Sequence, residues 1–230
     1  MMQNLFLLIH DSLLSRKRTS LPYHNVRVDR SRGCHSATFH VRLFLVLLLL
    51  LPATIAHAGN RKPVHFDVAE SGTKFSFDEA PIIEDGPTAG FPAYGNAFIT
   101  QGYIYPYATL LNGNGVNPDG SPEFPELVIG EWTCRGYFIG DGANTATGPW
   151  VITTQLYDFY TEPGYEANKQ SGAVNLVSEG YERADVGVLD KRSITGGTGP
   201  FKRARGEVNQ ALLGFNASGG VNLRFVVKTR

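Results

Sequence analysis

The chain has 230 residues, with 21 Lys and Arg against 21 Asp and Glu and only two cysteines. Residues 59–230, which follow a predicted leader, carry 14 basic and 19 acidic side chains, a net charge of −5. Such a balance argues against a nucleic-acid-binding protein, which would be expected to show a basic patch. These 172 residues are enough for one domain that needs neither a metal nor a disulfide to fold.

The N-terminal part predicts export. Residues 43–51 are an unbroken apolar run, and Ala56-His57-Ala58 follows as a small-residue cleavage site. This pattern is typical of a secretory signal peptide, and the run is shorter than the ~20 apolar residues of a membrane-spanning helix. We therefore expect residues 1–58 to be a leader removed after Ala58, and residues 59–230 to be secreted, into the extracellular space or the periplasm. A retained membrane anchor is the alternative.

Cysteine and histidine counts exclude several chemistries from the mature chain. Cys34 lies in the leader, so Cys134 and His65 are the only cysteine and histidine that remain after cleavage. We therefore expect no intramolecular disulfide and no metal site, because one thiol and one imidazole are too few ligands. Ser-His-Asp catalysis would depend on His65 alone, and no nucleophile-elbow motif is present.

The remaining sequence predicts strands rather than helices. Apolar residues alternate with polar ones in short runs, and turn residues separate the runs. The expected strands are 64–68, 75–77, 97–105, 127–139, 150–160, 174–181, 186–195, 204–213 and 221–228. Many short strands indicate a sandwich or a barrel. Glycines inside the strands, such as Gly102, Gly136 and Gly206, favour the strong curvature of a small closed barrel.

One stretch carries a family resemblance. Residues 194–208 read ITGGTGPFKRARGEV, with glycines for a tight turn or bulge and Gly206 where another strand would pass close by. The run resembles the GG(T/S)G-x-F hairpin of dirigent proteins and of the allene oxide cyclases, which share a barrel fold. Residues 130–136 and Gly148-Pro149 are similar to secreted bacterial allene oxide cyclase barrel-like proteins.

The resemblance implies an all-β fold, a closed antiparallel eight-stranded barrel covering residues 59–230. It also implies a small hydrophobic or phenolic ligand in the lumen, no cofactor, and self-association as a trimer or a dimer. The function expected from it is steering the coupling or cyclisation of that ligand, with any enzyme activity being that of a cofactor-independent cyclase or isomerase. A non-catalytic carrier or structural barrel with a packed lumen is the alternative.

Candidate site residues follow from strand alternation. Trp132 and Cys134 lie on the small, apolar face of their strand, which suits the interior of a tight barrel. Tyr103, Tyr105 and Tyr157 are the other residues expected to line a phenolic ligand. Each also has a structural interpretation, as core filler or as part of a cross-strand ladder.

Two carboxylates are the predicted catalytic residues. Asp158 lies between Tyr157 and Phe159, where an apolar setting would raise its pKa and make it a proton donor. Glu207 is the second candidate for a polar group that points into the lumen. For Asp158, a strand-end carboxylate bound to a turn is the alternative.

Separately, Asn216-Ala217-Ser218 is a glycosylation sequon in a turn that we expect to be accessible.

Overall fold

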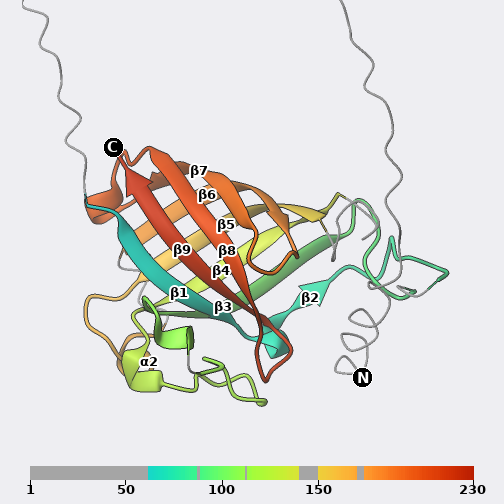
Figure 1. Cartoon of the computed structure of the whole chain (residues 1–230), viewed down its shortest axis with the longest axis horizontal. Coiled ribbons are helices and arrows are strands. Elements are labelled where there is room, and N and C mark those ends of the chain that lie inside the picture. The colour runs from blue at the N-terminus through green and yellow to red at the C-terminus, as the bar shows by residue number, and fades with distance from the viewer. Residues whose placement is uncertain (1–61, 87–88, 112, 140–149, 170–173) are drawn as a thin grey trace, which may run out of the picture. The chain divides into compact units, whose positions relative to one another are not determined.

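The computed structural model describes residues 62–86, 89–111, 113–139, 150–169 and 174–230. These residues form a β-barrel of long antiparallel strands, seen in Figure 1. The strands are β1 (Val64–Glu70), β2 (Ser76–Phe77), β3 (Ala97–Pro106), β4 (Gly130–Phe138), β5 (Trp150–Phe159), β6 (Val174–Arg183), β7 (Leu189–Gly197), β8 (Gly206–Phe215) and β9 (Val221–Thr229). The helical elements are η2 (Gly72–Lys74), η3 (Thr109–Leu111), η4 (Pro125–Leu127), α2 (Tyr165–Asn168) and η5 (Gly199–Phe201).

Eight of the strands close into a cylinder. The sheet order is β1-β9-β8-β7-β6-β5-β4-β3-β2, and β1 also pairs with β3, which closes the ring. Every strand pair is antiparallel. The short strand β2 lies outside the ring and pairs only with the beginning of β3. The predicted closed eight-stranded antiparallel barrel is therefore confirmed, with β2 as an additional strand.

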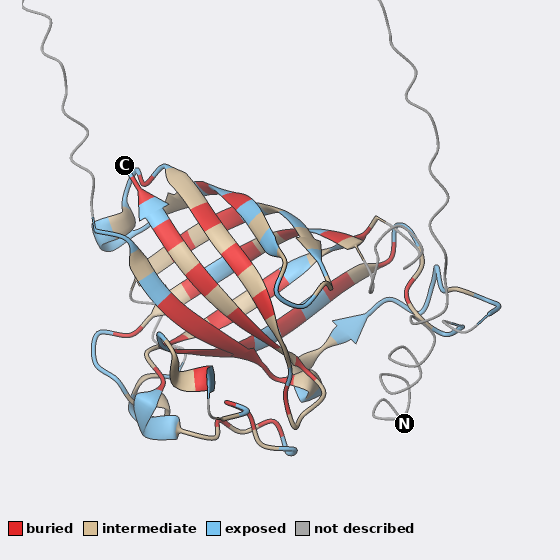
Figure 2. Ribbon diagram, in the orientation of Figure 1, coloured by how far each residue is buried: buried red, intermediate tan, exposed pale blue. Residues whose placement is uncertain are grey.

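Strand alternation separates the interior of the barrel from its outer face. Buried residues alternate with more exposed ones along most strands, which Figure 2 shows as red segments alternating with tan and pale blue ones. On β4, for example, Trp132, Cys134 and Phe138 are buried, whereas Arg135 and Tyr137 are exposed. This is the face that the sequence predicted for the interior.

An aromatic cluster lies inside the barrel. The rings of Phe66 and Phe225 are stacked with their centroids 5.1 Å apart. Tyr157 contacts both edge-on, at 5.4 Å and 5.3 Å. All three side chains are fully buried, so their contacts contribute to the apolar core that stabilises the barrel.

The glycine-rich segment forms a corner, as predicted. Strand β7 ends at Gly197, η5 follows, and β8 begins at Gly206. The register shifts opposite Val177 and Ser178, which is a bulge near the end of β7. Gly206 has a φ of +146°, and a Cβ there would lie 1.9 Å from the carbonyl oxygen of Lys228. This position accepts no side chain because β9 passes directly over it.

Some expectations differ from the structure or lie outside the described residues. Strands 127–139 and 186–195 begin later than predicted, at Gly130 and Leu189, because a 3-10 turn and a loop precede them. The sequon asparagine is not accessible: Asn216 is 7% exposed, and its Nδ2 donates to the carbonyl of Glu70 at 2.8 Å. The predicted leader, residues 1–58, lies outside the described residues. Within the residues that the structure describes, no helix is both long and apolar enough to span a bilayer.

The aromatic cluster gives a direct test of the packing. We expect Phe225→Ala to lower the free energy of unfolding by about 3–5 kcal/mol, because it opens a cavity among rings that cannot collapse onto it. Phe215→Ala is the matched control, since that ring is 50% exposed, and it should change stability by less than about 1 kcal/mol. Urea denaturation of both variants measures the difference, and equal losses would contradict this account of the core.

Candidate functional site

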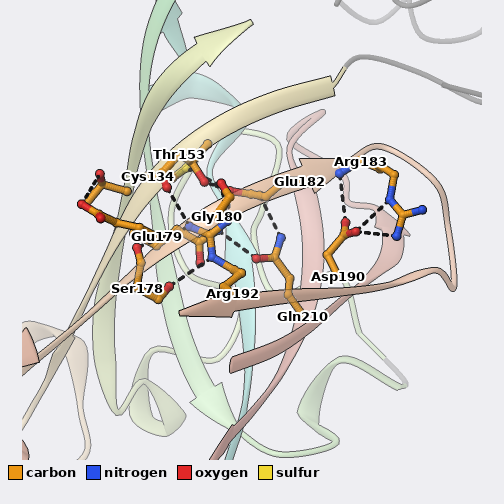
Figure 3. A network of polar contacts seen from close by, with 12 residues as sticks. Cys134, Thr153, Ser178, Glu179, Gly180, Glu182, Arg183, Asp190, Arg192 and Gln210 are labelled. Carbon is orange, nitrogen blue, oxygen red and sulfur yellow. Dashed lines mark hydrogen bonds and ion pairs between the residues drawn. The ribbon is translucent and has the colours of Figure 1, made fainter. Parts of the chain in front are cut away.

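A buried ion pair lies inside the barrel, between β6 and β7. The carboxylate of Glu182 accepts a hydrogen bond from Arg192 Nη1 at 2.9 Å, as Figure 3 shows. Amide groups complete its surroundings: Gln155 Nε2 donates to Oε1 and Gln210 Nε2 donates to Oε2, both at 2.8 Å. The thiol of Cys134 contacts Oε1 at 3.7 Å. The hydroxyl of Thr153 also donates to Oε1, so the donors around this carboxylate come from four strands, β4, β5, β7 and β8.

Arg192 is held more tightly than Glu182. Its side chain is fully buried, whereas 13% of the Glu182 side chain is exposed. Arg192 Nε donates to the Ser178 hydroxyl at 3.1 Å, and Nη2 donates to the carbonyl of Thr153 at 3.0 Å. The planar guanidinium can satisfy several acceptors at once in a fixed geometry, which a lysine could not do. Gly180 makes room for it, since a Cβ there would lie 3.2 Å from the Cα of Arg192.

The ion pair and its hydrogen-bond partners form a polar layer inside the barrel, and Tyr157 contacts both this polar layer and the aromatic cluster. Its ring packs against Phe66 and Phe225, and its hydroxyl lies 3.0 Å from the Ser178 hydroxyl and also donates to Gln155 Oε1. Burial raises the pKa of Tyr157 well above its ordinary value, so the phenol stays protonated and can donate. The ring of Tyr157 thus lies among apolar side chains, whereas its hydroxyl lies among polar ones.

Trp132 and Cys134 also face the lumen. Trp132 is 2% exposed, and its indole N–H has no acceptor among the described residues. A buried donor without a partner is rare in folded proteins and costs free energy. Burial, followed by the negative charge of Glu182, raises the pKa of the Cys134 thiol, so the sulfur is protonated and unreactive.

A second buried carboxylate lies elsewhere on the inner face. Glu70, at the end of β1, is 6% exposed and accepts hydrogen bonds from Thr100 Oγ1 at 2.6 Å and from the backbone N–H of Val221 at 2.8 Å. Burial is the main cause that raises the pKa of Glu70, and the hydrogen bonds oppose it. This carboxyl group is thus closer to its neutral form in the folded protein than in the unfolded chain.

The structure places Tyr103 and Tyr105 outside the lumen. They lie in a separate cluster with Leu110, Val116 and Val128, beneath the connection between β3 and β4. Their hydroxyls donate to backbone carbonyls of that connection, Tyr103 to Gly120 at 2.8 Å and Tyr105 to Gly115 at 2.6 Å. The structure therefore does not bring them together with Trp132, Cys134 and Tyr157, because strand alternation turns them to the opposite face of the sheet.

The two predicted catalytic carboxylates lie on the outer face as well. Asp158 alternates with Tyr157 and Phe159, whose rings point inward, and it pairs across the strands with Glu131. Glu207 lies 3.5 Å from Lys191 Nζ with 42% of its side chain exposed. The structure brings neither carboxylate to the lumen. The sequence analysis instead missed Glu182, Arg192, Gln155 and Gln210, although Leu176, Ser178, Gly180 and Glu182 form an alternating set that indicates an inward face.

Metal-binding groups are not concentrated anywhere in the described ranges. There, no group of three or more His, Cys, Asp or Glu side chains is arranged to hold a metal ion. The polar groups of the candidate site are therefore the Glu182–Arg192 ion pair, the amides of Gln155 and Gln210, and the Tyr157 phenol.

Comparisons with known proteins identify similar folds. No family model matches the chain, and no curated protein matches it. Among solved structures, the pterocarpan synthase dirigent protein PsPTS1 is 12% identical with a TM-score of 0.47, covering 73% of this chain and 92% of its own. The pterocarpan synthase dirigent protein GePTS1 is 13% identical with the same TM-score, covering 73% and 84%.

A third similar structure, pyocyanin demethylase, is 12% identical with a TM-score of 0.42, covering 72% of this chain and 99% of its own. Dirigent proteins, the family that the sequence resembles, thus recur among the similar solved structures. At these identities and scores the likeness assigns no activity to this chain.

The ion pair predicts a strong asymmetry between single and double substitutions. Arg192→Met should lower the free energy of unfolding by about 3–5 kcal/mol, because it leaves the Glu182 charge without its cation. Adding Glu182→Gln to Arg192→Met should recover part of that loss, since the buried charge is then removed. A urea-denaturation double-mutant cycle measures the coupling, and additive effects would contradict a cooperative network.

Glu70 predicts a pH dependence with a definite sign. Its pKa in the folded protein lies above its ordinary value of 4.5, so just above that pH the folded protein binds a proton that the unfolded chain has released. The contribution of Glu70 to the free energy of unfolding is therefore largest at low pH, and it is lost as the pH rises through the folded-state pKa. Relative to Glu70→Gln, the native protein should lose stability as the pH rises from about 4.5 to 7. Unfolding curves that stay parallel for the two proteins over this range would refute the assignment.

Proposed function

We propose that this chain is an exported barrel that binds a small apolar or phenolic molecule in its lumen and steers the coupling or cyclisation of that molecule. The observation that carries the proposal is the indole N–H of Trp132, which is buried in the lumen and has no acceptor among the described residues. A ligand oxygen, such as that of a phenol or a carbonyl, would accept this hydrogen bond and remove the cost of leaving the donor unpaired.

The surroundings of Trp132 suit such a ligand. Trp132 pairs across the strands with Tyr157, whose ring belongs to the aromatic cluster, and Cys134 is the next inward residue on β4. Aromatic rings on one side and amides of Gln155 and Gln210 on the other would hold a phenolic ring in one orientation. Glu182 would act as a positioning residue, because its carboxylate fixes the two amides. Steering would then consist of holding one conformation of a reactive molecule away from water.

A second candidate function is a structural barrel without a ligand. It is favoured by a specific observation: Phe66, Tyr157 and Phe225 are fully buried and pack against one another inside the barrel. In this case Trp132 would be core filler, and the polar layer would serve to specify the strand register.

Binding of 2-naphthol, a fluorescent phenol, separates these functions. We expect the native protein to bind it, and Trp132→Phe to weaken binding about tenfold, the loss of one hydrogen bond. Val151→Trp should abolish binding, because Val151 faces inward opposite Glu182 on the neighbouring strand and the larger ring would fill that end of the lumen. Leu189→Trp is the matched control at a position that is 52% exposed, and it should bind like the native protein.

No binding of 2-naphthol to a native protein that unfolds cooperatively would favour the structural barrel. Equal binding by Val151→Trp and the native protein would also refute a lumen site. Native mass spectrometry of protein purified from its secretion medium adds an independent readout, because a bound natural ligand would appear as a mass increment that Val151→Trp lacks.

A further inference from the structure

The outer face of the barrel carries a groove that the proposed lumen function does not use. It has a volume of about 740 Å³ and runs from β2 across β3, β4 and β5 to β6. Strand β2 pairs with β3 outside the ring of eight strands (Figure 1), and its residues Ser76 and Phe77 are part of the groove lining. Ligand sites for small molecules commonly have volumes of 300–1,000 Å³.

The floor of the groove is apolar, although it faces solvent. Phe77, Ile99, Tyr137 and Ile152 line it, and each is between 39% and 55% exposed. Tyr137 and Ile152 are directly paired across β4 and β5, so their side chains lie side by side. Four large apolar side chains gathered in one concave surface are unusual on the outside of a soluble domain and indicate a binding surface.

One cation lies in this apolar surface. Arg135 pairs with Ile99 on one side and with Thr154 on the other, and Tyr137 is the next outward residue on its own strand. Its side chain is exposed and forms no ion pair within the part of the chain that the structure describes. The planar guanidinium is suited to bind a carboxylate with two parallel hydrogen bonds.

Negative charges limit what else the ligand can carry. Asp78 and Glu179 also line the groove, and Glu179 Oε1 accepts a hydrogen bond from Thr154 at 3.3 Å on the side away from Arg135. A second anionic group on the ligand would approach these like charges, which disfavours it. The apolar side chains and the one guanidinium of the lining therefore suit an aromatic body that carries no more than one carboxylate.

We propose that this groove is a second small-molecule site, separate from the lumen, that binds an aromatic monocarboxylic acid through Arg135. The ring system packs on Ile99, Tyr137 and Ile152, and the carboxylate contacts the guanidinium. The site is on the outer face, so its occupation does not depend on whether the lumen binds a ligand.

The test compares 2-naphthoate with its neutral isostere 2-naphthamide by isothermal titration calorimetry. The native protein should bind 2-naphthoate at least about tenfold more tightly than 2-naphthamide, the contribution of a charge-assisted hydrogen bond. Arg135→Gln should remove that preference, and Tyr137→Ala should weaken the binding of both probes. Lys228→Gln, which removes an exposed cation on β9, is the matched control and should bind both probes like the native protein.

Further outcomes distinguish this site from the lumen and from an oligomer interface. Val151→Trp should leave binding of 2-naphthoate unchanged; its loss in that variant would place the probe in the lumen and overturn the proposal. Binding unaffected by Arg135→Gln, or no binding at all, would overturn it as well. A native dimer that Ile152→Asp converts to a monomer, together with no probe binding, would instead assign the groove to a second copy of the chain.

Discussion

The barrel depends on the close approach of β1 and β3. These strands close the ring, and Gly102 of β3 lies where a Cβ would be 2.3 Å from the carbonyl oxygen of Ala69 on β1. Any larger residue there would push the two strands apart. Without this pairing, β1 and β3 would each present unpaired N–H and C=O groups along most of their length, a hazard that closure removes. Both candidate sites rest on strands held in place by this contact.

Closure also creates the interior in which a buried ion pair can exist. Removing Arg192 and Glu182 from water is costly, and the pair gains enough only because amides, hydroxyls and carbonyls satisfy the remaining hydrogen-bonding groups. The donors come from different strands, so the network forms only when the strands have the correct register. We infer that the network selects one register of a barrel whose apolar residues alone would specify it less strictly. This role holds whether or not the lumen binds a ligand.

The sequence predicted the architecture well but the site only in part. Strand periodicity and turn glycines are local signals, and they correctly indicated the strands, the corner at Gly206 and the inward face of Trp132 and Cys134. The placement of Tyr103 and Asp158 depends on which face of each strand closes inward, and one sequence does not determine that for a strand with polar and aromatic residues on both faces. The partners Glu182 and Arg192 lie on a neighbouring pair of strands, where only the register brings them together.

The two candidate sites differ in what a ligand must do to enter them. The lumen contains Trp132, Tyr157 and Phe225, each no more than 2% exposed, so a molecule that binds there must displace or rearrange packed side chains. The groove on β3 to β6 is already open, and its apolar side chains already face solvent. Binding in the groove therefore needs little reorganisation and should have a high association rate. Binding in the lumen should be slower, because it requires transient local opening of the barrel. The same sheet thus carries an open groove on its outer face and a packed interior, because alternate side chains on each strand lie on different faces of the barrel.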